Sequence, residues 1–303
     1  MLPLLPEITV IVTSLTAIGV ITIVGPTKIR EFRAKALDRF QYVLPYLLLV
    51  GAVLFINSFL RDIGPTLSWM IGWRITDDIF LLEGNFVGWL QTYSHPLADL
   101  YFSYIYIYGY IFMLVFPIVA YFVLTDDRPV REAAIAYALN YGIGLICYTL
   151  FIAYGPRNVI PDTVDQVLYL YWPESNMLTT EVNANVNVFP SLHTSLAVTV
   201  ALLAYRTRNE YPLWVPIAGL LALSVAFSTM YLGIHWLTDV IAGIALAVIS
   251  VGAAMWFTSP ARKDGKLYTL GTYLRLPVDY PLQLVIDWIR RRRPSSHKPS
   301  QTE

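Results

Sequence analysis

The sequence predicts an all-α membrane protein, a polytopic bundle of about six to seven transmembrane helices with further helices at the membrane surface. Three observations lead to this fold class. Hydrophobic residues make up 56% of the 303 residues and charged residues 14%, whereas soluble domains average about 45–50% and about 25%. Mean hydropathy is +0.54. The apolar residues also gather in runs that approach the roughly 20 residues a bilayer-spanning helix needs.

Seven apolar runs are candidate transmembrane helices. They are Ile8–Val24, Tyr42–Leu60, Ala98–Leu124, Ala133–Ala153, Pro190–Tyr205, Leu213–Leu232 and Trp236–Phe257. The fifth run is short for a span. We keep it because Pro190 suits the first turn of a helix and the polar run Arg206–Glu210 ends it. The N-terminal residues lack the basic segment and cleavage site of a signal peptide, so the first run is predicted to be a helix of the bundle.

Two segments lie outside these runs. Ile63–Leu90 mixes three tryptophans with charged residues and is predicted to form interfacial helices, because tryptophan favours the headgroup level. Residues 1–260 are predicted to form the membrane domain. Residues 261–303 are predicted to be a basic, partly disordered cytoplasmic tail, in which Arg290–Arg293 is attracted to anionic lipid. The single cysteine, Cys147, forms no internal disulfide.

The basic residues predict the orientation of the seven runs. Lysine and arginine favour cytoplasmic loops, and nearly all of the 21 in this chain fall in the first, third and fifth loops and the tail. Only Arg61, Arg74 and Arg157 fall on the opposite side. We therefore expect an integral protein of the plasma membrane or an equivalent membrane, with the N-terminus outside and the C-terminus in the cytoplasm.

Two short histidine motifs carry the candidate chemistry. N-V-F-P-S-L-H ends at His193, and S-T-M-Y-L-G-I-H-W-L-T-D contains Ser228, His235 and Asp239. The chain has four histidines in all, and an ionisable side chain is costly near hydrocarbon unless it has a partner or a function. The predicted topology places both motifs at the outer ends of spans. This placement favours one catalytic site on the non-cytoplasmic face over two separate interfacial anchors.

The spacing of the residues in these motifs suits phosphate chemistry. His235 and Asp239 are four apart at a helix start, so their side chains share a face. The carboxylate can hold one ring nitrogen and leave the other as a nucleophile or base. Pro190 and Ser191 open another helix, whose free amides attract phosphate. Arg157, in Y-G-P-R, begins the longest outer loop and offers a forked donor for phosphate oxygens, although an interfacial anchor is an alternative for this residue.

These motifs resemble the type 2 phosphatidic acid phosphatase superfamily, whose three blocks are K-x6-R-P, P-S-G-H and S-R-x5-H-x3-D. The second block matches Pro190–His193, with Leu192 in place of glycine. The third matches the spacing of Ser228–Asp239, with Thr229 in place of arginine. The forms F-P-S-L-H and S-T-x-Y-L-x-x-H are closer to the branch that contains inositol phosphorylceramide synthases. The implied catalytic core covers about residues 148–257.

The first block departs most from the family pattern. Arg157 is its one match, because Leu150 stands where the family has lysine. The dipeptide Arg128-Pro129 matches the R-P of the first block but falls on the predicted cytoplasmic side. One arginine at about 4 Å contributes roughly 4 kcal/mol at an effective dielectric near 20. Loss of the family cations therefore disfavours a dianionic phosphate monoester more than a monoanionic diester.

The resemblance implies a role for each matching residue. His235 would attack phosphorus and form a phosphohistidine, and Asp239 would orient and stabilise its ring. His193 would protonate the leaving oxygen as the general acid. Arg157 and the backbone near Ser191 would hold the phosphate oxygens. The resemblance implies no metal ion, and we expect no cofactor.

The expected activity is transfer of a phosphoryl or substituted-phosphoryl group from a lipid phosphate. The missing cations favour a lipid headgroup phosphotransferase similar to an inositol phosphotransferase. A phosphatase for lipid phosphates or pyrophosphates, in which water replaces the acceptor alcohol, is the alternative. A catalytically inactive transporter or scaffold is a third possibility, but such a protein has no need for His193, His235 and Asp239 together.

Other residues have two interpretations each. Ser228 binds substrate or packs against a neighbouring span, and Tyr231 fills the space or donates where the family arginine would reach. Three asparagines and five tyrosines either line a substrate cavity or serve loop and helix packing. They are Asn183, Asn185, Asn187, Tyr101, Tyr104, Tyr106, Tyr108 and Tyr110. The asparagines are candidates for binding a polyol acceptor. The zero net charge implies no nucleic-acid partner, and the oligomeric state stays open.

Overall fold

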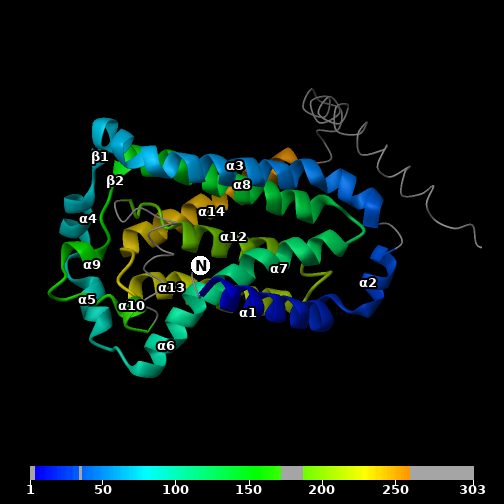
Figure 1. Ribbon diagram of the computed structural model, residues 1–303, viewed down its shortest axis with the longest axis horizontal. Coiled ribbons are helices and arrows are strands. Elements are labelled where there is room, and N and C mark those ends of the chain that lie inside the picture. The colour runs from blue at the N-terminus through cyan, green and yellow to red at the C-terminus, as the bar shows by residue number, and fades with distance from the viewer. Residues whose placement is uncertain (1–3, 34–35, 172–186, 260–303) are drawn as a thin grey trace, which may run out of the picture. The chain divides into compact units, whose positions relative to one another are not determined.

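The computed structural model of the protein describes residues 4–33, 36–171 and 187–259 (Figure 1). The chain divides into two compact units, Met1–Thr258 and Ser259–Glu303. All of the helices and strands described below belong to the first unit. The predicted basic tail, residues 261–303, lies outside the described residues, as do Asn183 and Asn185.

The first unit is almost entirely helical, which confirms the predicted all-α class. In chain order its helices are α1 (Leu4–Gly19), α2 (Pro26–Arg33), α3 (Ala36–Ile71), α4 (Thr76–Glu83), α5 (Phe86–Gln91), α6 (Pro96–Tyr104), α7 (Tyr110–Val123), α8 (Arg128–Leu150), α9 (Pro156–Val159), α10 (Val167–Tyr171), α12 (Leu192–Arg206), α13 (Trp214–Tyr231) and α14 (Leu237–Phe257). Two π-helical turns, η1 (Val20–Val24) and η2 (Ile105–Gly109), extend α1 and join α6 to α7. Two strands, β1 (Trp73–Arg74) and β2 (Phe151–Ile152), pair in parallel.

Among the described residues, six helices are long and apolar enough to cross a membrane. They are Leu5–Val24, Arg39–Ser58, Pro96–Val123, Arg128–Leu150, Trp214–Tyr231 and Leu237–Phe257. These correspond to six of the seven predicted runs. The fifth predicted run forms α12, whose 15 residues extend only about 22 Å at 1.5 Å per residue.

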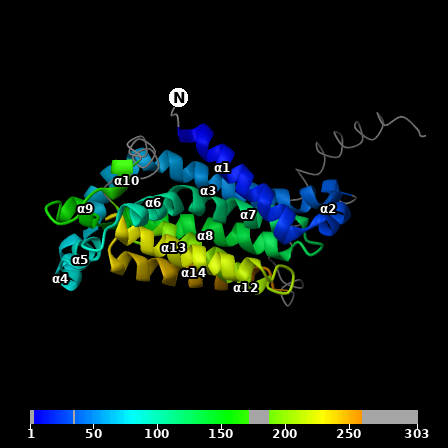
Figure 2. The same ribbon diagram turned by 90° about the horizontal axis from the view of Figure 1, so that it is seen from below.

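Helix α12 is short but surrounded by other helices. It contacts α7, α8, α13 and α14, and both views show these helices running alongside one another (Figures 1 and 2). Most of its residues are buried. Because neighbouring helices rather than lipid surround α12, its length need not match the bilayer.

The prediction of interfacial helices over Ile63–Leu90 is wrong for its first part. Residues 63–71 continue α3, which runs for 36 residues and packs along α8. The helix ends before Gly72, where a Cβ would lie 2.4 Å from the carbonyl oxygen of Ser68. Helix α3 thus continues through Gly64-Pro65, a pair that local rules treat as a break. The rest of the segment forms the short helices α4 and α5, near α9 and α10 at one end of the bundle (Figure 1).

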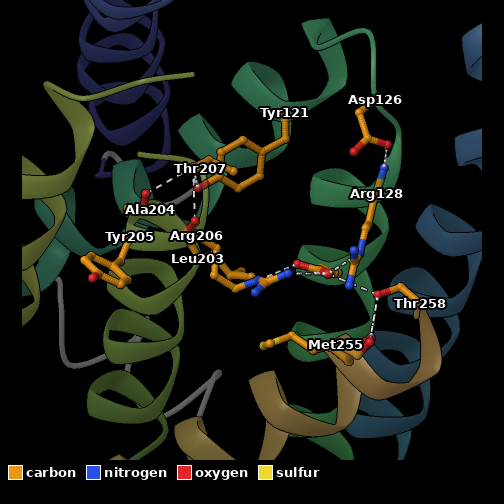
Figure 3. Close-up of polar contacts among 12 residues, drawn as sticks. Tyr121, Asp126, Arg128, Leu203, Ala204, Tyr205, Arg206, Thr207, Met255 and Thr258 are labelled. Carbon is orange, nitrogen blue, oxygen red and sulfur yellow. Dashed lines mark hydrogen bonds and ion pairs between the residues drawn. The ribbon is translucent and has the colours of Figure 1, made fainter. Parts of the chain in front are cut away.

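A buried carboxylate joins three helices far from this end. Glu132 in α8 is 3% exposed and accepts hydrogen bonds from Arg128 Nε (2.8 Å) and Arg206 Nε (2.9 Å). Thr258 Oγ1, just after α14, donates to it as well (3.1 Å; Figure 3). Arg206 ends α12, and His193 lies in the first turn of the same helix, so about 20 Å of helix separate this cluster from the histidine motifs.

Candidate active site

The starts of α12 and α14 meet through backbone contacts. The amide of Ser191, the residue before α12, donates to the carbonyl oxygen of Asp239 in α14 (3.0 Å). A Cβ on Gly243, one turn further along α14, would lie 2.5 Å from the carbonyl oxygen of Ser191. Only glycine permits this approach, which brings the two histidine motifs together. His193 lies two residues after Ser191 and His235 four residues before Asp239, so this backbone contact joins the two segments that carry the histidines.

His235 and Asp239 form a buried pair at the start of α14. Their exposed fractions are 2% and 0%, and His235 Nδ1 lies 3.3 Å from Asp239 Oδ2. The same carboxylate oxygen accepts the amide of Trp236 (2.9 Å), which caps the helix. Asp239 is therefore fixed by its helix and engages one ring nitrogen of His235. The other nitrogen, Nε2, is the one that Asp239 leaves for chemistry.

A tight turn between α13 and α14 presents His235. The amides of Ile234 and His235 both donate to the carbonyl oxygen of Thr229 (3.0 Å each). Gly233 within this turn has φ +71°, a left-handed conformation that favours glycine. A Cβ there would also lie 2.6 Å from Val164 Cγ1. The backbone of the turn is thus fixed on both sides of His235.

Arg157 is attached to the same turn from the α8 side. After β2 the chain reaches Gly155, where a Cβ would lie 2.3 Å from the carbonyl oxygen of Ile234. The amide of Arg157 donates to the carbonyl oxygen of Gly233 (3.1 Å). The Arg157 side chain is 7% exposed, and its guanidinium lies 4.9 Å from the ring centroid of Tyr169. The Arg157 backbone is thus fixed to the His235 turn, and its buried guanidinium suits an anionic substrate.

Two tyrosines of the third span pack on His193. The ring of Tyr106 stacks on the imidazole with centroids 4.4 Å apart and 19° between planes, and Tyr110 lies 4.2 Å away at 38°. Two residues of the aromatic run therefore contact His193. They are four residues apart and so share a helix face. Tyr101 and Tyr104 are exposed instead, and Tyr108 donates to Glu7.

Tyr148 is a member of this region that sequence reasoning missed. Its hydroxyl donates to the carbonyl oxygen of Pro190 (3.2 Å), at the entrance to α12. Its backbone carbonyl accepts a hydrogen bond from Nδ2 of the Asn187 side chain. The Asn187 side chain is thus engaged by the last turn of α8. A tyrosine near the end of an apolar run gives no sequence signal of such a position.

The one substitution in the second family block, Leu192, has a structural explanation. Ser191 caps α12, since its Oγ accepts the Thr194 amide (3.4 Å) and lies 3.0 Å from Thr194 Oγ1. Leu192, where the family has glycine, packs over Gly144 of α8. A Cβ on Gly144 would lie 2.6 Å from Leu192 Cδ2. A small residue in α8 thus makes room for the large one in the motif.

Two predicted substrate-binding residues have other partners. Ser228 is buried and its hydroxyl donates to the carbonyl oxygen of Val225 in its own helix (2.7 Å). The Tyr231 hydroxyl donates to Asp99 Oδ1 (2.5 Å) and accepts the amide of His95 (3.3 Å). Neither hydroxyl is directed at His235, so we leave both out of the candidate site. Arg128, paired with Glu132, also lies outside it.

The assembled site contains His193, His235, Asp239, Arg157, Ser191 and Tyr148. It combines two imidazoles from separate helices, a carboxylate that orients one of them, and a buried guanidinium. This set can perform nucleophilic and acid–base chemistry on an anion. Within residues 4–33, 36–171 and 187–259, no three His, Cys, Asp or Glu side chains are grouped closely enough to hold a metal ion.

Comparison with known proteins identifies the family of the chain. A family model described as the PAP2 superfamily matches residues 81–253, a range that holds every residue of the site. An uncharacterized protein of Methanocaldococcus jannaschii is 29% identical over 173 residues, which are 56% of this chain and 66% of the relative. The chain thus spans just under two thirds of that relative's length.

A second relative is named for its activity. The lipid A 4'-phosphatase of Porphyromonas gingivalis is 29% identical over 181 residues, covering 56% of this chain and 70% of the relative. No solved structure matches. Neither relative supports the narrower resemblance to inositol phosphorylceramide synthases.

Proposed function

Since the chain belongs to the PAP2 superfamily, we propose that it is a membrane enzyme that hydrolyses a lipid phosphate through a phosphohistidine on His235. The observation that carries this proposal is the convergence of His193, His235, Asp239 and Arg157 at the joined starts of α12 and α14. The similarity to a lipid A 4'-phosphatase supports a lipid phosphomonoester as substrate.

The proposed reaction has two displacement steps. Nε2 of His235 attacks phosphorus, and the bond between phosphorus and the lipid oxygen breaks while His193 gives that oxygen a proton. Water then attacks the phosphohistidine, His193 takes the water proton, and the P–N bond breaks to release phosphate. Asp239 holds Nδ1 throughout, so the ring stays oriented and its positive charge is stabilised. Arg157 balances the charge on the phosphoryl oxygens.

Transfer to an alcohol is the second candidate function. It is favoured by the scarcity of cations, because Leu150 and Thr229 occupy the positions of the family lysine and arginine. Leu150 is 45% exposed, and the Thr229 hydroxyl donates to the carbonyl oxygen of Ala226 (2.8 Å). Neither side chain supplies positive charge, so a monoanionic diester is held more easily than a dianion. The acceptor would be a polyol in place of water.

The proposed location of the site is the non-cytoplasmic face. Basic side chains support this orientation, since Lys28, Arg128 and Arg206 lie in or beside the predicted first, third and fifth loops, at the helix ends away from His193 and His235. Cytoplasmic loops favour such residues. The proposal also makes the enzyme metal-independent, because none of the steps above uses a metal ion.

The test compares two lipids with the purified full-length protein in detergent. We expect phosphate release from phosphatidate, and loss of at least about 1,000-fold in rate in His235→Gln. His95→Gln is the matched control, because the His95 imidazole caps α6 by accepting the Leu97 amide (3.2 Å), and the variant should keep wild-type activity. Cleavage of phosphatidylinositol with transfer of phosphoinositol to an added alcohol would establish the second candidate instead. Full activity of His235→Gln would contradict both.

A further inference from the structure

Glu83 connects a short surface helix to the catalytic helix. It is the last residue of α4, and its carboxylate accepts two amides from the first turn of α14. Oε2 accepts the amide of Leu237 (2.9 Å), and Oε1 accepts that of Thr238 (2.5 Å). The contact spans 154 and 155 positions of sequence and is made two residues after His235. Nothing in the two histidine motifs predicts it.

The position of Glu83 is unfavourable for its own helix. The C-terminal end of a helix carries partial negative charge, so that an acidic residue is disfavoured there and favoured at an N-terminus. Gly84, with φ +57°, follows immediately and ends α4. The negative charge of the carboxylate is therefore unfavourable at the C-terminal end of α4 and favourable at the N-terminal end of α14. The contact with α14 explains its placement.

Glu83 and Asp239 together occupy the first turn of α14. Asp239 Oδ2 accepts the amide of Trp236 (2.9 Å), and Glu83 accepts the next two. The three amides that would otherwise attract an anion are thus taken by carboxylates. The phosphate must then approach His235 from the side of α12 and Arg157.

Helix α4 holds the same segment by a second contact. The rings of Phe80 and Trp236 have centroids 6.1 Å apart. Trp236 is fully buried, and its indole N–H donates to the carbonyl oxygen of Tyr154 (2.8 Å). The residues on the C-terminal side of His235 are thus held by α4 and by the segment that leads to Arg157.

We propose that Glu83 is a positioning residue for His235. By fixing the amides of Leu237 and Thr238, it sets the start of α14 and hence the orientation of the His235–Asp239 pair. This inference rests on the proposed function, in which His235 attacks phosphorus. Glu83 itself does not touch the substrate. Its loss should therefore slow the chemical step and leave substrate binding nearly unchanged.

The test is Glu83→Gln beside Asp78→Asn in the full-length protein. Asp78 lies in the same helix, but its side chain is exposed, so it matches the change in charge without the contact. With phosphatidate in detergent, we expect kcat of Glu83→Gln to fall roughly 10- to 100-fold, as for a small misplacement of a reacting group. KM should stay within about 2-fold, and the melting temperature should fall by about 5 °C or less. Asp78→Asn should match the wild type in all three quantities.

Two results would overturn the proposal. One is a kcat of Glu83→Gln within about 2-fold of the Asp78→Asn value. The other is loss of activity in proportion to loss of folded protein, which indicates a structural role alone. If Glu83→Gln does not fold, Glu83→Asp provides the same test, because it keeps the charge but shortens the reach by one methylene.

A second measurement separates this inference from the proposed function. Hydrogen exchange of the peptide that contains Leu237 and Thr238 should be faster in Glu83→Gln than in Asp78→Asn, whatever the substrate. Unchanged exchange contradicts the positioning role even if the enzyme is active. Faster exchange in a protein that hydrolyses no lipid phosphate contradicts the proposed function and leaves the contact established.

Discussion

Gly155 lies directly against Ile234, so that a single added carbon on Gly155 would come within 2.3 Å of the Ile234 carbonyl oxygen. This contact joins the segment that carries Arg157 to the turn that carries His235. It is made by backbone atoms that have no flexible side chain to move aside. The position of the Arg157 backbone relative to the His235 turn therefore depends on a glycine.

Gly155→Ala should impair both stability and turnover. The new methyl group must push the two backbones apart, which costs about 1–3 kcal/mol as for other overpacked sites and displaces Arg157. We expect a lower melting temperature and a kcat/KM for phosphatidate reduced by at least about 10-fold. Gly142→Ala is the control, because a Cβ there meets nothing within 4 Å. In the middle of α8 it should be neutral or stabilising by up to about 1 kcal/mol. Equal behaviour of the two variants would contradict the close contact.

Asp239→Asn should lower activity far more than stability. The amide oxygen can still accept the Trp236 N–H, so the helix cap is kept. The negative charge that stabilises and orients His235 is lost. We expect kcat to fall at least about 100-fold in a protein that keeps its thermal unfolding curve. A variant that unfolds instead, or one that stays active, would count against the catalytic role of this carboxylate.

The stacking of Tyr106 on His193 predicts a graded response to substitution. Tyr106→Phe keeps the ring and should retain activity within about 3-fold if stacking alone positions the imidazole. Tyr106→Ala removes an aromatic contact of about 0.5–1.5 kcal/mol and leaves space beside His193, the proposed general acid. Its kcat should fall about 10-fold or more. A Tyr106→Phe variant as slow as Tyr106→Ala would show that the hydroxyl, rather than the ring, is what His193 requires.

Glu132→Gln should have the opposite profile to Asp239→Asn. The substitution leaves Arg128 and Arg206 without a carboxylate partner, and an unpaired buried charge or polar group typically costs about 1–3 kcal/mol. The cluster lies at the other end of α8 and α12 from the histidines. We therefore expect a lower melting temperature with kcat per folded molecule unchanged. A large loss of kcat in fully folded protein would mean that this end of the bundle acts on the site.

Removal of metal ions should leave turnover intact. The proposed steps use two imidazoles, a carboxylate and a guanidinium, and none needs a bound cation. We expect the same rate for phosphatidate before and after dialysis against a chelator. Loss of activity that returns with one added divalent ion would contradict the proposed chemistry.

The parts of the fold that follow from local sequence were predictable. Apolar runs of span length correspond to six membrane-length helices, and the four-residue spacing of His235 and Asp239 corresponds to a side-chain contact. The extension of α3 through Gly64-Pro65 was not predictable, because glycine and proline both disfavour a helix interior and the contact of α3 with α8 leaves no local sequence signal.

The parts of the site that depend on distant contacts could not be predicted. Glu83 follows a leucine pair in a short helix, and its role follows only from the two amides of α14 that it accepts. Tyr148 has no motif at all. Tyr231 lies within the third block, but its hydroxyl donates to Asp99. In each case the deciding partner is more than 40 residues away in the chain.

The central claim is that His235 becomes phosphorylated, and direct detection of that intermediate tests it. The protein would be mixed with phosphatidate, quenched in alkali to preserve phosphohistidine, and digested for mass spectrometry. The account predicts a phosphoryl group on the peptide that contains His235, absent from Asp239→Asn mixed for the same short time. Turnover of phosphatidate with the phosphoryl group on another residue, or with no phosphorylated protein at the earliest times, would contradict the account.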